Sequence, residues 1–102
     1  MPIKSKLRLP FTLVNVRRAP ADPGVYVLWS DDELIYYGFA LGGVVTIRSS
    51  VKDHRLGLFG ARTARATHFG WEVCRDPVRR QAELLREYRA SHKTLPRCNK
   101  KP

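Results

Sequence analysis

The sequence predicts a single α+β domain in which helices flank a small three-stranded antiparallel β-sheet. Two runs of branched and aromatic residues, 25–29 and 34–37, are typical of strands, and the polar residues 30–33 between them suit a tight hairpin turn. The alternating segment 68–74 predicts a third strand. Asp76 followed by Pro77 is a common helix start. The expected order is strand, strand, helix, a short helical turn, strand and helix.

The chain is short and strongly basic. It has 102 residues and a formal net charge of +10, from 19 lysines and arginines against 9 acidic residues. Residues 44–102 hold most of the excess, with 14 basic and 5 acidic side chains. This charge favours a polyanionic partner, with nucleic acid first; a solvated basic surface is the alternative. The length suits one hydrophobic core, and no apolar run reaches the roughly 20 residues of a membrane span.

Residues 1–19 are expected to form a basic lead-in to the domain at residues 20–102. Four prolines between positions 2 and 23 should keep any helix or strand there short. Phe11, Leu13, Val14 and Val16 are candidates for packing one short element against the core, whereas residues 1–8 are expected to be a solvated arm. No signal-peptide pattern follows Met1, so a cytoplasmic protein is expected. Cys74 and Cys98 lack zinc-site spacing and should be reduced.

Two longer helices can be placed from their caps and their periodicity. Thr46 is a suitable N-cap for a helix over residues 47–55, and the second helix should run from Pro77 to about Ser91. Residues 58–67 between them are expected to hold one short helical turn. The buried face of the second helix is expected to contain Val78, Ala82, Leu85 and Tyr88, and Leu84 widens it.

Each strand of the predicted hairpin carries a tyrosine close to a glycine. Residues 24–26 (Gly-Val-Tyr) and 36–38 (Tyr-Tyr-Gly) resemble the paired motif of the GIY-YIG nuclease family, and the resemblance extends over about residues 20–99. It implies a GIY-YIG-like fold and a divalent-metal-dependent endonuclease that hydrolyses nucleic-acid phosphodiester bonds. DNA is expected ahead of RNA, with low or structure-directed specificity, and either a monomer or a homodimer would fit.

Two alternatives to the nuclease stay open. The first is a catalytically impaired nucleic-acid-binding module of the same fold, and the second is a small structural or partner-binding protein. Phosphate contacts impose a steep dependence of affinity on salt, so a salt-dependent affinity for nucleic acid would separate the first alternative from the second.

The resemblance implies catalytic roles for residues far apart in the chain. Tyr26 would activate or orient the attacking water, and Tyr36 would face the same site. Glu83 would hold Mg²⁺ or Mn²⁺, for which carboxylate oxygens are suited, while His54 and Asn99 would complete the site. From residue type alone, Tyr26 would be an interior tyrosine, Glu83 a surface residue paired with an arginine, and Asn99 a turn cap.

One position departs from the family pattern. The family carries an arginine one helical turn before a His or Tyr on the first helix. His54 fits the second position, but Ser50 stands four residues before it. Arg48 is close in sequence but about 200° away around a helix. Either Arg48 reaches the site, or another cation replaces it, or catalysis is impaired.

Basic side chains in the second half of the chain are expected to contact the phosphate backbone, since lysine and arginine bind phosphate through charge-assisted hydrogen bonds. They are Lys52, Arg55, Arg62, Arg65, Arg97 and Lys100. Four aromatic residues are expected in the core rather than as stacking platforms for bases: Trp29, Phe59, Phe69 and Trp71.

Overall fold

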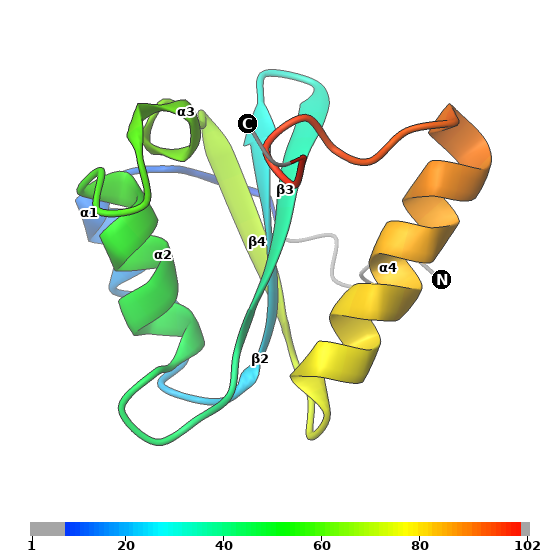
Figure 1. The fold of residues 1–102 in the computed structure, drawn as a ribbon. Helices are drawn as coiled ribbons and strands as arrows, with labels where there is room; N and C mark the ends of the chain where they lie inside the picture. The colour runs from blue at the N-terminus through cyan, green and yellow to red at the C-terminus, as the bar shows by residue number, and fades with distance from the viewer. Residues whose placement is uncertain (1–7, 101–102) are drawn as a thin grey trace.

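The computed structural model describes residues 8–100, which form an α+β fold with a four-stranded antiparallel sheet and four helices (Figure 1). In chain order the elements are β1 (Leu9–Pro10), α1 (Leu13–Val16), β2 (Gly24–Ser30), β3 (Glu33–Ala40), α2 (Ile47–Arg55), α3 (Ala61–Ala64), β4 (His68–Val73) and α4 (Pro77–His92). From β2 onwards, this is the predicted order of elements.

The sheet contains one strand more than the three that the sequence predicts. Its order is β1-β4-β2-β3, and each pair of neighbours is antiparallel. The additional strand, β1, has two residues and pairs Leu9 with Phe69 and Pro10 with His68 of β4. The prediction of three strands was wrong because a two-residue strand that contains a proline leaves no periodic pattern in the sequence.

Part of the expected N-terminal lead-in belongs to the core. Phe11, Val16 and Ala19 are buried, whereas Leu13 and Val14 of α1 are exposed, so the predicted packing of these two residues against the core was wrong. Residues 8–19 therefore pack with the rest of the fold. The expected solvated arm falls almost wholly on residues 1–7, which lie outside the described residues.

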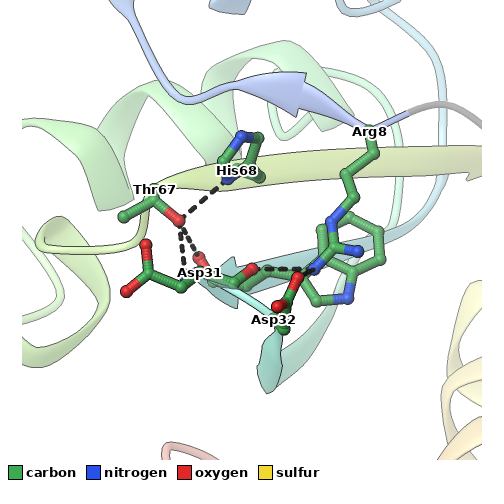
Figure 2. Close-up of polar contacts among 6 residues, drawn as sticks. Arg8, Asp31, Asp32, Thr67 and His68 are labelled. Carbon is green, nitrogen blue, oxygen red and sulfur yellow. Dashed lines mark hydrogen bonds and ion pairs between the residues drawn. The ribbon is translucent and has the colours of Figure 1, made fainter.

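The hairpin of β2 and β3 closes through a two-residue turn at Asp31 and Asp32. Asp31 has a left-handed backbone with φ of 54°, a conformation that aspartate tolerates better than most residues. Arg8 donates to the Asp31 carbonyl at 2.7 Å, and its guanidinium lies 4.5 Å from the ring centroid of Trp29 (Figure 2). The Thr67 hydroxyl accepts from the Asp31 amide at 2.7 Å. Residues next to the starts of β1 and β4 thus hold the turn.

The sheet separates two hydrophobic clusters. On one face, α2 contributes Ile47 to a cluster that includes Tyr26. On the other face, α4 contributes Leu84 to a cluster that includes Val27 and Tyr37. Figure 1 shows α2 and α4 on opposite sides of the sheet. Adjacent residues of one strand therefore serve different faces, as the alternation of strand side chains requires.

The caps of the two long helices confirm the predictions. Thr46 caps α2 and forms a capping box with Ser49, in which each side chain accepts a hydrogen bond from the other residue's backbone amide. Asp76 caps α4 by accepting from the Arg79 amide at 3.2 Å. These local signals satisfy backbone donors that a helix start leaves without partners, which explains why sequence alone located them.

Polar contacts set the rotation of α4 on the sheet. Arg80 donates to Glu72 of β4 at 2.7 and 3.2 Å, and the Gln81 amide donates to a β3 carbonyl at 3.0 Å. Between these contacts Leu84 is buried, whereas Val78 is 50% exposed. The predicted buried face was therefore wrong at Val78 and at Ala82, which is also exposed, because contacts of side chains outside the apolar stripe set the orientation of the helix.

Candidate functional site

Tyr26 of β2 and Tyr36 of β3 line one cavity on the α2 side of the sheet. Their ring centroids are 6.1 Å apart. The cavity, here called the tyrosine cavity, has a volume of about 410 Å³ and is lined by Tyr26, Tyr36, Phe39, Val45, Ser50, His54, Phe59, Thr63 and Cys98. Tyr37 packs into the cluster on the opposite face. Three of the predicted site residues, Tyr26, Tyr36 and His54, thus meet in one place.

Close packing explains why the two motif positions 24 and 38 are glycines. Gly38 lies opposite Tyr26 in the strand register, and a Cβ there would overlap the Tyr26 ring and hydroxyl. A Cβ on Gly24 would overlap the Glu72 backbone carbonyl of β4. Gly38 therefore lets the Tyr26 ring lie against β3, and Gly24 lets β4 approach β2. Both positions need glycine because a side chain would not fit there, and not because the backbone angle is unusual.

His54 is the buried centre of the tyrosine cavity, with only 2% of its surface exposed. Its Nε2 lies 2.8 Å from the Tyr26 hydroxyl, and its Nδ1 lies 2.8 Å from the Thr63 hydroxyl. Burial lowers the pKa of His54 from 6.5 to about 4, so the imidazole is neutral at pH 7. A neutral imidazole offers one donor and one acceptor, which satisfies both hydrogen bonds.

The tyrosines of the cavity are also neutral. Burial raises the pKa of Tyr26 well above its usual 10, and the neighbouring Tyr36 and Asp53 raise it further. Burial raises the pKa of Tyr36, although a hydrogen bond with Tyr26 acts in the opposite direction. A phenol with a raised pKa is a poor base at neutral pH, and so is an imidazole with a pKa of about 4. The cavity therefore holds hydrogen-bonding groups rather than a strong base.

The predicted cation on α2 does not reach the tyrosine cavity. The Arg48 Nε donates to the Ala19 carbonyl at 2.7 Å, and the side chain lines a separate cavity between α1 and α2. Ser50, which is 6% exposed, is the α2 residue that faces the tyrosine cavity one turn before His54. The residues that line the tyrosine cavity include no lysine and no arginine.

Asn99 and α4 meet at the edge strand β3. The Asn99 side chain accepts from the Tyr37 amide and donates to the Tyr37 carbonyl, both at 2.9 Å. The Gln81 side chain donates to the same carbonyl at 3.0 Å. Sequence reasoning singled out Asn99 but missed Gln81. A signal for Gln81 existed, since it lies three and four residues before Leu84 and Leu85 on the sheet side of α4.

Glu83 does not line the tyrosine cavity. It is half-buried on α4, which covers the other face of the sheet (Figure 1). Its charge acts on Arg80, whose pKa is raised first by the hydrogen bond to Glu72 and also by the charges of Glu72 and Glu83.

The donor set of the tyrosine cavity does not suit Mg²⁺ or Mn²⁺. Within residues 8–100, no three His, Cys, Asp or Glu side chains gather as a metal-ligand group. Magnesium sites use at least one carboxylate as a rule, and no carboxylate lines the tyrosine cavity. Its lining consists of phenols, hydroxyls, a thiol, an imidazole and apolar groups.

Three of the predicted nucleic-acid contacts lie together. Arg62, Arg65 and Arg97 line a second cavity of about 250 Å³ with Ser30 and Cys98, here called the arginine cavity. Cys98 also lines the tyrosine cavity, so the two cavities adjoin. Their arrangement places cationic groups beside a neutral aromatic recess.

The other three predicted contacts lie elsewhere. Lys52 shares the cavity of Arg48 between α1 and α2. The Arg55 Nε donates to the Phe11 carbonyl at 3.1 Å. Lys100 lies with Lys93 near the end of α4. Three of the six basic residues therefore lie together, and the other three lie at separate places.

Phe59 is exposed, so its predicted place in the core was wrong. Its side chain is 59% exposed, and its ring centroid lies 4.6 Å from that of His54. It follows the end of α2 and covers one side of the histidine while its other side meets solvent. Phe69 is fully buried, and Trp71 and Trp29 pack against the two clusters, as predicted.

No family model, curated protein or solved structure matches this chain. Within the described residues 8–100, no helix is long and apolar enough to cross a membrane.

Proposed function

We propose that this chain is a nucleic-acid-binding domain with a GIY-YIG-like fold whose hydrolytic chemistry is impaired, with DNA expected ahead of RNA. One observation carries the proposal: the tyrosine cavity lacks the charged groups that the resemblance requires beside the tyrosines. Ser50 faces the tyrosine cavity one turn before His54, where the family carries an arginine. Glu83, the carboxylate that the resemblance assigns to the metal, does not line the tyrosine cavity.

The absence of these charged groups should greatly lower the rate of phosphodiester hydrolysis. A cation that stabilises a transferring phosphoryl group contributes about 10³- to 10⁵-fold in rate. A bound metal lowers the pKa of its water and so supplies the nucleophile at neutral pH. With the pKa of His54 near 4 and that of Tyr26 raised, no group of the cavity replaces either contribution.

Binding needs fewer components than hydrolysis, and the chain supplies them. The net charge is +10, and Arg62, Arg65 and Arg97 gather at one cavity. Arginine forms paired hydrogen bonds with phosphate oxygens. Each phosphate contact releases counterions, so the affinity should fall steeply as salt rises.

Fluorescence anisotropy with a labelled oligodeoxynucleotide tests the proposal between about 50 and 200 mM salt. The logarithm of the association constant should fall linearly with the logarithm of the salt concentration. Arg62→Ala should reduce that slope by about one. Arg75→Ala is the control, because it removes the same charge at the opposite end of the sheet. Arg75 follows the end of β4 that pairs with Gly24, whereas the arginine cavity lies at Ser30, at the other end of β2. This variant should leave the slope unchanged. Absence of salt-dependent binding to DNA and to RNA would overturn the proposal.

A metal-dependent endonuclease is the second candidate, favoured by the convergence of Tyr26, Tyr36 and His54. In that case Glu83 holds Mg²⁺ or Mn²⁺, and Glu83→Ala abolishes strand scission while leaving binding largely intact. The assay is incubation of supercoiled, single-stranded and branched DNA with each metal. Scission by the unmodified chain that depends on metal and on Glu83 would replace the first proposal with the second.

A further inference from the structure

We infer that the tyrosine cavity takes an unpaired nucleobase, so that single-stranded nucleic acid is the preferred partner. The inference rests on the proposed nucleic-acid binding and names its substrate class. In a duplex the bases are paired and stacked with one another, whereas a single strand can turn individual bases outward. A recess that prefers a flat neutral ring therefore selects for unpaired nucleotides.

Two exposed aromatic side chains line the tyrosine cavity. Phe59 is 59% exposed and Phe39 is 36% exposed, and both line the cavity. The Phe59 ring is supported from behind by His54 at 4.6 Å between centroids. Exposed rings held in place by a second ring are suited to base stacking, which tolerates any sequence because every base has a π-face.

Val45 adds an exposed aliphatic side chain to the lining of the tyrosine cavity. It is 47% exposed, and its neighbour Val44 is 93% exposed. A charged phosphate gains nothing from such apolar groups, but the face of a base does.

The interior of the tyrosine cavity is neutral and of suitable size. Its lining includes no charged side chain, and a volume of about 410 Å³ falls in the range of about 300–1,000 Å³ typical of small-molecule pockets. Tyr36, Ser50 and Thr63 bring hydroxyl groups to the wall. Hydroxyls donate or accept as required, so they can bond to the polar edge of a base.

The adjoining arginine cavity accounts for the strand's phosphates. Arg62, Arg65 and Arg97 line it, and Cys98 is common to both cavities. Arg62 donates to the Arg97 carbonyl, which holds the two residues together. Arg97 pairs with Glu33 at 3.6 Å, with both side chains 52% exposed, and such an exposed pair is easily exchanged for a phosphate. A nucleotide whose base enters the tyrosine cavity thus has cations beside its backbone.

The test compares three labelled oligodeoxynucleotide probes of one length by fluorescence anisotropy: a single strand, the same strand in a duplex, and an abasic single strand with the same phosphates. Base–aromatic stacking contributes about 1–3 kcal/mol per base, which corresponds to about 5- to 150-fold in the dissociation constant. The single strand should therefore bind at least about fivefold more tightly than the other two probes.

Phe59→Ala should remove most of that preference without changing the affinity for the duplex. Leu58→Ala is the matched control, because Leu58 is 69% exposed, against 59% for Phe59, but does not line the cavity. Both positions are more than half exposed, so thermal unfolding should show that both variants fold.

The outcomes separate the inference from the proposed function. Equal affinities for the three probes, or an unchanged preference in Phe59→Ala, would overturn the inference while salt-dependent binding still upheld the proposed function. Failure of all three probes to bind would overturn the proposed function, and the inference with it.

Discussion

Acid should destabilise this domain through His54. The imidazole is 2% exposed, and burial lowers its pKa from 6.5 to about 4. In the unfolded chain the imidazole regains its ordinary pKa, so between these two values the unfolded state binds more protons than the folded state. Stability therefore increases with pH through this window. The contribution of the neutral His54 is present above pH 6.5 and is lost as the pH falls towards 4.

The size of the effect follows from the two pKa values. One pKa unit corresponds to about 1.36 kcal/mol, so the difference between 6.5 and about 4 limits the contribution to about 3 kcal/mol. About 2 kcal/mol of it should be lost between pH 7 and pH 4.5. This is a substantial part of the roughly 5–15 kcal/mol that stabilises a typical domain.

Urea unfolding followed by tryptophan fluorescence at a series of pH values measures the effect. His54→Gln is the comparison, because its amide can still donate and accept between Tyr26 and Thr63 but does not titrate. Carboxylates titrate in both proteins, so the difference between their pH profiles isolates the histidine. The free energy of unfolding of the natural chain should fall about 2 kcal/mol further than that of His54→Gln between pH 7 and pH 4.5.

Two results would refute this reasoning. Parallel pH profiles for the natural chain and His54→Gln would mean that the histidine does not control the acid response. An NMR titration of the His54 ring with a midpoint near 6.5 would mean that the imidazole is not held neutral by burial.

Two further predictions concern the strands around the site. Gly38→Ala should lower the free energy of unfolding by about 1–3 kcal/mol, because its Cβ overlaps the Tyr26 ring. Thermal unfolding measures this loss, and an unchanged stability of Gly38→Ala would contradict the prediction. Asn99→Ala should cost about 1–2 kcal/mol by removing both hydrogen bonds to Tyr37. Hydrogen exchange of the Tyr37 amide should then accelerate, whereas Lys100→Ala should leave it unchanged; equal rates in the two variants would argue against the anchor.

The sequence predicted the local parts of this fold well. Thr46 and Asp76 mark the helix starts, and the polar residues 30–33 mark the hairpin, because each signal acts on backbone groups a few residues away. The alternation of strand side chains also determines that Tyr36 and Tyr37 face opposite sides. The two-residue β1 carries no such signal, and the structure alone revealed it.

Tertiary packing determines which side chains line the site. Helical geometry places Arg48 and Ser50 on different sides of α2, but only the packing of α2 on the sheet turned Ser50 towards Tyr26 and Arg48 towards Ala19. The contacts of α4 with β3 and β4 likewise brought Gln81 to the edge strand. Sequence by itself determined β2, β3 and β4, the two long helices and the paired tyrosines, since these depend on short-range geometry. Which helix side chains meet the tyrosines depends on contacts between segments distant in sequence, which only the folded chain brings together.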